Sequence, residues 1–517
     1  MELPKKYKHD DVEARWAKTW DNNQLYQWKA GVSRDETFSV DTPPPTVSGS
    51  LHIGHVFSYT HTDAMARFQR MQGKNVFYPM GWDDNGLPTE RRVQQVYGIT
   101  CKPELVYDST LTYIAGKAKK PHEYTPVSRQ NFIEACAQLT QEDEKVFEAL
   151  WRKLGLSVDW SLTYATIDDH CREVSQRSFL DCVDKGRVYS VETPCMWDTD
   201  FQTAVAQAEI EDRDKPGAYH HLSFGTDTGT TFEVATTRPE LLASCIAVVA
   251  HPEDERYKAL FGTHAITPLF GAKVPIVAST HADPEKGTGI LMVCTFGDNE
   301  DVQWWKQSDL PIKQTVGRDG CLLPVVFGEA PFESENVQRA QGYYDQLVGK
   351  RVKKARQVMV ELLQQDGSAS DGVAKAMQRD IEAVEHPVKF YEKGDNPVEF
   401  MSTRQWFISL LDQKEALVAQ GNNIDWHPPY MKTRYQHWVE GLNQDWCISR
   451  QRYFGVPFPV WYPVNEQGEP DYDAPIFATQ SQLPVDPQMD VPAGFTDIQR
   501  NQPGGFMADP DVMDTWA

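Results

Sequence analysis

The sequence predicts an α/β protein in which an open parallel-sheet domain is interrupted by an inserted β-rich domain. Residues 37–41 and 75–79 are typical of strands and flank a helical segment, 53–72, which is the order of a β–α–β crossover. Between about 218 and 348 the chain changes to short β-branched segments separated by Gly, Pro and Asp, such as 231–236 and 289–295. A charged, more helical stretch, 349–385, then leads back to aromatic-rich sequence.

The N-terminal elements follow in order. A helix is predicted over 11–22, where Trp16 and Trp20 share one face. The strand at 37–41 ends at three prolines, 43–45, because proline has no N–H for a sheet and disfavours helix in the residue before it. Residues 46–50 form the connecting loop before the helix 53–72 and the strand 75–79. Ligands of such sheets bind beyond the carboxyl ends of the strands, so the site is expected in the loops that follow them.

The length of 517 residues is enough for about three domains. We expect the first half of the parallel-sheet domain, with an N-terminal helix, in 1–208. The inserted β-rich domain is expected in 209–348, and the return to the first domain in 349–517.

Composition excludes several classes of protein. Hydrophobic residues make up 40% and charged residues 24%, as in folded globular proteins, and no apolar run approaches the ~20 residues that span a bilayer. The N-terminus lacks the apolar segment of a secretory signal, so we expect a cytoplasmic protein. The net charge of −23 confines any nucleic-acid contact to a local surface. Nine cysteines without a C-x-x-C pair predict reduced thiols and no structural zinc.

The loop 43–55 carries the first candidate site. It precedes the crossover helix, where backbone N–H groups and the helix dipole favour phosphate. His52 and His55 flank Gly54, which has no side chain to block a purine or ribose. Imidazole donors at this position can stabilise charge on a transferring phosphate. The alternative is that the two histidines only begin the helix.

This loop resembles the His-Ile-Gly-His signature of the class I aminoacyl-tRNA synthetases, and the preceding Pro-Pro-Pro-Thr-Val-Ser-Gly resembles their valine-specific branch. Residues 81–90 and 446–451 are similar to two further motifs of the family. The resemblance implies a Rossmann-like catalytic domain that uses ATP and Mg²⁺ to activate valine and transfers it to tRNA(Val). It makes His52 and His55 the catalytic pair, and places Pro45, His52, Gly54 and His55 at the ATP.

The amino-acid site is implied by the same resemblance. Asp83, in the loop after the second strand, would bind the α-ammonium group. Pro44, Thr46 and Trp446 would wall a dry pocket for the aliphatic side chain. The valine branch commonly has Asn where this chain has Thr46, which leaves isoleucine as the alternative substrate. Without the resemblance, Asp83 is typical of a turn and Trp446 of a core aromatic.

The inserted domain resembles the editing domain of this family. A pocket for valine excludes threonine poorly, because exchanging a methyl for a hydroxyl group keeps the shape, so a second, hydrolytic site is expected. An aspartate can grip the ammonium of threonyl-tRNA(Val), and an arginine can hold its RNA. The alternative for 237–240 is an N-cap with Pro and Glu in a first helical turn. The predicted editing residues are Thr236, Thr237, Arg238, Glu240, Asp298 and Asp301.

Two further parts of the resembled family are expected beyond residue 517: a Lys-Met-Ser-Lys-Ser loop that stabilises ATP, and an anticodon-binding domain. We therefore expect half of a synthetic site and a whole editing domain, in a monomer that contacts the acceptor end of the tRNA. The alternatives are a fragment of an isoleucine-tRNA ligase, or a fragment that only edits or binds RNA.

Overall fold

The structure is a computed structural model that describes residues 8–47, 51–84, 86–116, 123–280, 282–294, 311–365, 376–377 and 379–514. Its internal contacts divide the chain into two compact units. Unit 1 comprises Met1–Arg187 and Ser449–Ala517, and unit 2 is Val188–Ile448, inserted into it in sequence. The boundaries 208/209 and 348/349 predicted for the inserted domain concern a smaller part of unit 2 and stay a prediction.

Unit 1 contains the predicted crossover. Strand β1 (Thr37–Ser39) pairs in parallel with β2 (Asn75–Phe77), and α2 (Ile53–Met71) connects them. The strand–helix–strand prediction is therefore confirmed. The inner face of α2 packs with Tyr59 and Ala66 against a cluster that includes Tyr78 and Trp151.

Most other elements of unit 1 are short. Two further strand pairs are parallel, β3 with β6 and β4 with β5, whereas β18–β22 and β20–β19–β21 are antiparallel. The helices are α1 (His9–Asn22), α3 (Leu87–Tyr97), α4 (Arg129–Leu154) and α5 (Asp169–Asp184). The strands are β3 (Gly81–Trp82), β4 (Ile99–Cys101), β5 (Thr125–Val127), β6 (Tyr164–Ala165), β18 (Ser449–Arg450), β19 (Val460–Pro463), β20 (Ile476–Phe477), β21 (Phe506–Ala508) and β22 (Val512–Met513).

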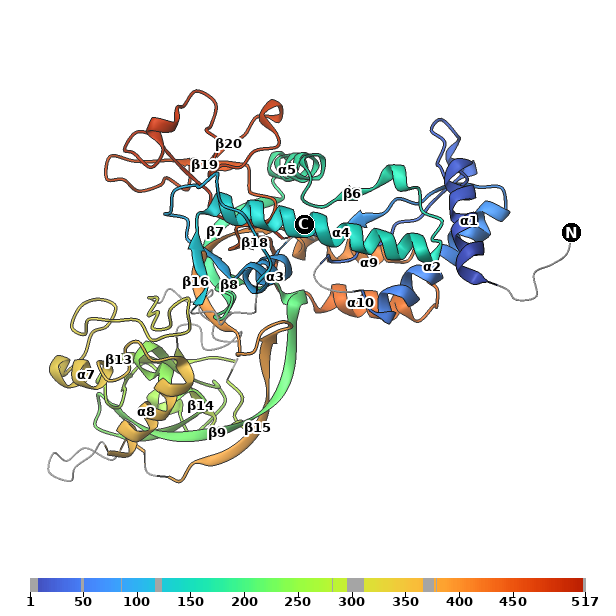
Figure 1. Cartoon of the computed structure of the whole chain (residues 1–517). Helices are drawn as coiled ribbons and strands as arrows, with labels where there is room; N and C mark the ends of the chain where they lie inside the picture. Colours follow the sequence, from blue (N-terminus) through green and yellow to red (C-terminus); the bar gives the residue numbers. More distant parts are fainter. Residues whose placement is uncertain are drawn as a thin grey trace, which may run out of the picture. The chain divides into compact units, whose positions relative to one another are not determined.

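Helix α4 is the long helix of unit 1 (Figure 1). It begins where the Ser128 side chain accepts a hydrogen bond from the Asn131 N–H at 3.2 Å. It ends at Gly155, whose φ of 71° is a left-handed conformation that favours glycine. Its buried face carries Phe132, Phe147 and Trp151 into the core.

Unit 2 is built on a seven-stranded sheet with the order β10–β9–β12–β13–β11–β14, in which β15 also pairs with β9. β9 and β15 run side by side as a long curved ribbon (Figure 1). β10 and β14, the first and last strands of that order, also contact each other, so the sheet curls. The strands are β9 (Ile210–Thr226), β10 (Thr231–Thr236), β11 (Cys245–Ala250), β12 (His264–Ile266), β13 (Lys273–Ala278), β14 (Ile290–Cys294) and β15 (Glu382–Tyr391). The β-rich structure predicted between about 218 and 348 is confirmed by these strands.

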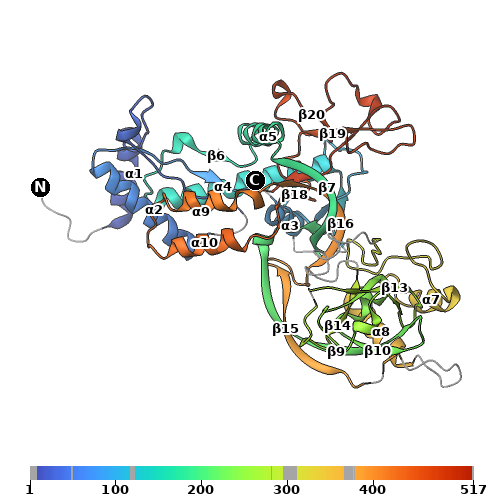
Figure 2. The same ribbon diagram turned by 180° about the vertical axis from the view of Figure 1, so that it is seen from behind.

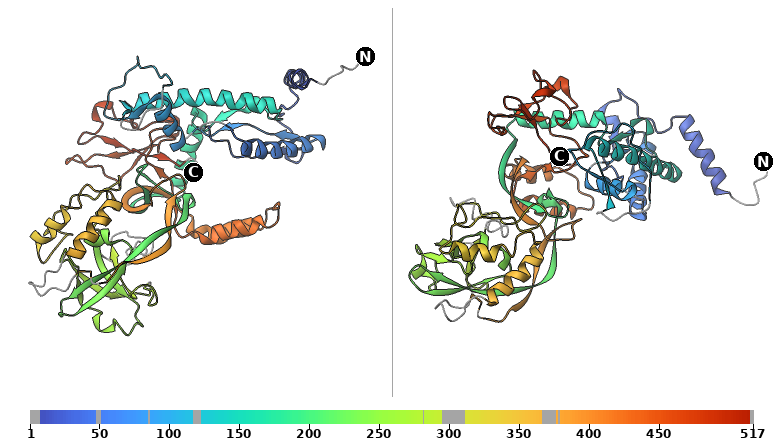
Figure 3. Two further views of the ribbon diagram at one scale, coloured as in Figure 1. Left: turned by 60° about the horizontal axis from the view of Figure 1, so that its bottom comes forward. Right: turned by 60° about the vertical axis from the view of Figure 1, so that its left-hand side comes forward.

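A four-stranded sheet, β17–β16–β7–β8, also belongs to unit 2, and its long strands β7 and β16 lie side by side (Figure 2). Its strands are β7 (Val188–Asp198), β8 (Thr203–Ala204), β16 (Glu399–Ile408) and β17 (Trp446–Cys447). The helices of unit 2 are α7 (Val337–Tyr344), α8 (Val352–Gln365), α9 (Lys414–Gly421) and α10 (Met431–Gly441). The last two, drawn in orange, pack against each other (Figure 3).

The stretch 349–385, predicted to be more helical, is only partly so. Helix α8 ends at Gln365, and the last residues of the stretch already belong to β15, which begins at Glu382. The charged residues Lys353, Lys354 and Arg356 lie on α8, whereas the exposed Glu382 and Glu385 lie on β15. Within the described ranges no helix has the length and apolarity needed to cross a membrane.

Candidate functional site

The N-terminus of α2 brings His52 and His55 together. The Gly54 N–H donates to His52 Nδ1 at 3.1 Å, and the His52 N–H donates to His55 Nδ1 at 3.3 Å. The two ring centroids are 4.0 Å apart. Burial and the neighbouring His52 lower the pKa of His55. Because both Nδ1 atoms accept, the neutral form of each imidazole carries its proton on Nε2, and among the described residues no hydrogen bond occupies that atom.

Gly54 is required by this turn. A Cβ at this position would lie 2.9 Å from His52 Cε1, closer than carbon atoms normally approach. The glycine therefore lets the His52 ring fold back over the first turn of the helix and cap it.

The loop after β3 holds Asp83 beside the proline segment. The Asp83 N–H donates to the Pro45 carbonyl at 2.9 Å, and the Val47 N–H donates to the Asp83 carbonyl at 2.8 Å. The Thr46 hydroxyl donates to Asp83 Oδ2 at 3.0 Å. Pro44 is half-buried beside these residues in the chain. The structure thus joins Thr46 to Asp83, and gives Thr46 a role as a hydrogen-bond donor that its expected place in the pocket wall did not include.

Trp446 lies in unit 2, on β17, where it is the register partner of Ile408 on β16. It is half-buried. Its place in the amino-acid pocket stays a prediction, since Pro44, Thr46 and Asp83 belong to unit 1.

The predicted editing peptide follows β10. Thr236 is the last residue of that strand, opposite His220 of β9, and its hydroxyl accepts the Arg238 N–H at 3.1 Å. Thr237 comes next and is half-buried. A short 3₁₀ helix, η5 (Pro239–Ser244), then begins without a side-chain cap, so the predicted N-cap by Thr237 is wrong, although Pro does occupy the first helical position.

A buried network of four charges fixes this peptide. Arg238 Nε donates to Glu240 Oε1 at 3.1 Å, and an Arg238 terminal nitrogen donates to Glu399 Oε2 at 2.7 Å. Arg356 of α8 binds both oxygens of Glu240, each at 2.8 Å. The two guanidinium groups hold the pKa of Glu240 below its usual value despite complete burial. Positive and negative groups alternate along the network, which compensates the cost of burying them.

The Gly-Thr-Gly turn, 287–289, meets the same peptide. The Ala235 N–H donates to the Thr288 hydroxyl at 3.3 Å, and a Cβ at Gly287 would lie 3.2 Å from the Ala235 Cβ. The turn 287–289 therefore lies against the end of β10, next to the predicted editing peptide. Asp298 and Asp301 fall outside the described residues.

Sequence reasoning missed two buried carboxyl groups in unit 1. Glu90 of α3 accepts the N–H groups of Tyr453 at 2.7 Å and Phe454 at 2.9 Å, which ties α3 to the loop after residues 446–451. Asp84, next to Asp83, is fully buried. Both stand in the motif 81–90, but only burial distinguishes their roles, and burial cannot be read from that motif.

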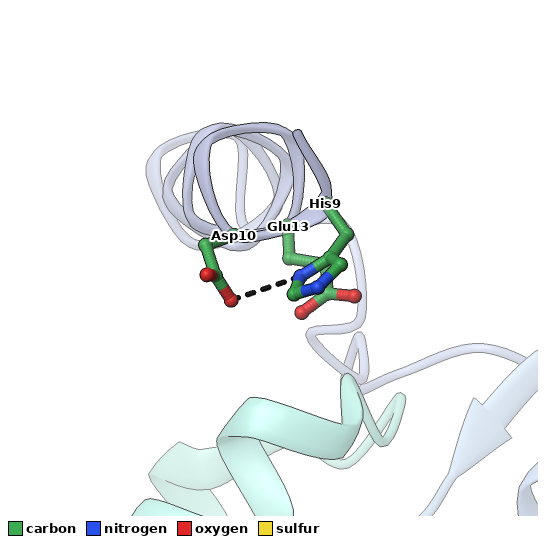
Figure 4. A group of neighbouring side chains, drawn as sticks. All are labelled: His9, Asp10 and Glu13. Carbon is green, nitrogen blue, oxygen red and sulfur yellow. Dashed lines mark ion pairs between the residues drawn. The ribbon is translucent and has the colours of Figure 1, made fainter. Parts of the chain in front are cut away.

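One exposed group has the chemistry of metal ligands. His9, Asp10 and Glu13 of α1 have ligand atoms within 4.8 Å of one another, and His9 Nδ1 lies 2.9 Å from Asp10 Oδ1 (Figure 4). All three are exposed at the positive end of a helix dipole, which disfavours a cation. We assign no metal to them. Cys195 is a reduced cysteine buried in β7.

A β–α–β crossover with two imidazoles at its helix start and a carboxylate after its second strand is typical of parallel-sheet α/β proteins that bind ligands in the loops after their strands. Residues 15–517 match the family model of tRNA synthetases class I (I, L, M and V), and the chain belongs to this family. The predicted Rossmann-like domain with a β-rich insertion is thereby confirmed.

Its relatives are more specific. The chain is 54% identical over 519 residues to the valine–tRNA ligase of Thermobifida fusca (strain YX), covering 100% of this chain and 57% of that protein. It is 53% identical over 519 residues to the valine–tRNA ligase of Salinispora arenicola (strain CNS-205), covering 100% and 58%. The chain thus spans a little more than half the length of these curated relatives.

A solved structure also matches: the ternary complex of Agrobacterium radiobacter K84 agnB2 LeuRS with tRNA and LeuAMS, at 20% identity and a TM-score of 0.43. The match covers 99% of this chain and 59% of that one.

Proposed function

We propose that this chain carries synthetic-site and editing portions of a valine–tRNA ligase. The observation that supports this most is the 54% identity along the whole chain to a protein of that name. The reaction would be ATP-dependent activation of valine to valyl-adenylate, transfer to tRNA(Val), and hydrolysis of threonyl-tRNA(Val). Because the chain spans 57% of that relative, we assign each step only to residues that are present.

The nucleotide would bind at the start of α2. The N-terminal backbone N–H groups and the Nε2 donors of His52 and His55 are suited to phosphate oxygens, and Gly54 leaves room beside them. The Pro45 carbonyl accepts the Asp83 N–H at 2.9 Å, which would fix Pro45 where it lines the site for ATP. Mg²⁺ would neutralise the phosphates when bound. Within the described ranges the only cluster of three potential metal ligands is on α1, so no residue is assigned to Mg²⁺.

The α-ammonium group of valine would bind Asp83, a residue that is 5% exposed and whose carboxylate is oriented by the Thr46 hydroxyl. Removing one partner of such a buried charge pair costs about 2–5 kcal/mol, so Asp83→Asn should weaken valine binding by roughly 30-fold or more. Isothermal titration calorimetry with valine measures this. The matched control is Asp425→Asn, an exposed carboxylate, which should leave the affinity unchanged. Equal affinities for the wild type and Asp83→Asn would remove Asp83 from the site.

The editing reaction would involve the peptide 236–240, with Asp298 binding the ammonium group of the mischarged threonine and Asp301 as a further editing residue. The wild type, Asp298→Ala and Asp425→Asn should be incubated with threonyl-tRNA(Val) and with valyl-tRNA(Val). We expect rapid, threonine-selective hydrolysis that only Asp298→Ala abolishes. Hydrolysis at the buffer rate by a wild type that still binds the tRNA would contradict the editing assignment.

A further inference from the structure

Asp84 has no exposed surface and its backbone is held on both sides. Its relative exposure is 0%, compared with 5% for Asp83. The Asp84 N–H donates to the Thr166 hydroxyl at 3.2 Å, and the Thr89 hydroxyl donates to the Asp84 carbonyl at 2.8 Å. Within the described part of the chain, neither carboxyl oxygen of Asp84 receives a hydrogen bond. An ionised carboxylate in this state would be very costly.

The groups around Asp84 make ionisation still less favourable. Glu144 of α4 faces it, and Asp83 and Asp143 add further negative charge. The Asp143 carboxylate is already bound by Arg92 of α3 through two hydrogen bonds, of 2.6 and 2.8 Å. The contacts from the loop after β6 and from the start of α3 are the hydroxyl groups of Thr166 and Thr89, which carry no charge.

The carboxyl groups of Asp84 and Glu144 have no hydrogen-bond donor between them when both are ionised, and protonation of one supplies an O–H donor. Between two facing carboxyl groups, one proton turns a repulsive pair into a hydrogen bond. We infer that Asp84 is a positioning residue that stays protonated and donates to the Glu144 carboxylate, so that the loop after β3 presents Asp83 as its one negative charge. Burial, first, and Glu144, second, raise the pKa of Asp84 to about 9, which agrees with a proton retained at neutral pH.

The consequence for binding rests on the proposed function of Asp83. The α-ammonium group of valine would meet a single carboxylate at a fixed position, because the Asp84–Glu144 hydrogen bond anchors the residue that follows Asp83. Since the pKa of Asp84 is higher in the folded chain than in the unfolded chain, its stabilising effect is complete at low pH and is lost as the pH rises through about 9. Above that pH the loop should lose its anchor.

Difference infrared spectroscopy of the whole chain tests the proton directly. We expect the C=O stretch of a protonated carboxyl group at pH 7 in the wild type. The band should shift on carboxyl-¹³C labelling of aspartate, disappear as the pH is raised through about 9, and be absent from Asp84→Asn. Glu144→Gln should alter its frequency. The lack of an Asp84-dependent band at pH 7 would overturn the inference, whatever the chain does with valine.

Valine binding tests the positioning role separately. Asp84→Ala should lower the affinity for valine at pH 7 by about tenfold, and Asp84→Asn, neutral and of the same shape, should restore it. The ratio of wild-type to Asp84→Asn affinity, in which the titration of valine itself cancels, should fall above pH 9. Equal affinity for the wild type and Asp84→Ala would overturn the positioning role. If no variant binds valine while the infrared band is present, the proposed function fails and the shared proton stands.

Discussion

Glu240 accepts three hydrogen bonds from two guanidinium groups and has no exposed surface, so its replacement by alanine is a demanding test of the buried network. Breaking a buried ion pair costs about 3–5 kcal/mol, because an uncompensated charge remains. Here Arg238 keeps Glu399, and the Arg356 side chain is 38% exposed and can recover water. We therefore expect the lower end of that range, about 3 kcal/mol, for Glu240→Ala.

Hydrogen–deuterium exchange mass spectrometry on the whole chain measures this loss locally. A destabilisation of about 3 kcal/mol corresponds to roughly 100-fold faster exchange in peptides that exchange through opening of the network. The acceleration should appear in η5, β11 and α8, while unit 1 stays unchanged. The control is Glu361→Ala, on the exposed face of α8, which should change exchange by less than about twofold. An acceleration below about fivefold in η5 would refute the reasoning.

The remaining predictions concern unit 1. An NMR titration should give His55 a pKa below the ordinary value of 6.5, and His52→Asn should raise that pKa. Because the folded chain favours the neutral imidazole, His55 stabilises the fold above pH 6.5, and this stabilisation is lost as the pH falls through the lowered pKa. Glu90→Gln should cost about 2 kcal/mol in urea unfolding, because both N–H groups donate to Glu90 Oε1 and a neutral amide oxygen is a weaker acceptor than a carboxylate. Gly81→Ala should cost about 1–3 kcal/mol in the same assay, because its Cβ would overlap the Tyr164 ring, and Tyr164→Leu should recover part of it.

The fold was predictable where local pattern and tertiary structure agree. The three prolines at 43–45 and the helical spacing of 53–72 predict β1, α2 and β2, because each signal acts within a few residues. The run 231–236 coincides with β10 for the same reason. The stretch 349–385 was predictable only in part: helix α8 occupies 352–365, whereas the strand that begins at Glu382 depends on its long-range pairing with β9.

In the candidate sites too, residues close together in sequence could be predicted and long-range contacts could not. The pair His52 and His55 could be read from spacing, since both lie within one helical turn. The ion pair of Glu240 with Arg356 joins residues 116 positions apart, and that of Arg238 with Glu399 joins residues 161 positions apart. A local sequence pattern cannot predict contacts at these separations. The state of Asp84 depends on burial beside α4, which the motif 81–90 does not encode.

The most direct test of the account compares two mischarged substrates: threonyl-tRNA(Val) and valyl-tRNA(Ile). Initial rates of hydrolysis by the whole chain should be measured for both at equal concentration, with Asp298→Ala as the reference. We expect rapid, Asp298-dependent loss of threonine from tRNA(Val) and only background loss of valine from tRNA(Ile). Preferential cleavage of valyl-tRNA(Ile) would contradict it and identify the isoleucine branch instead.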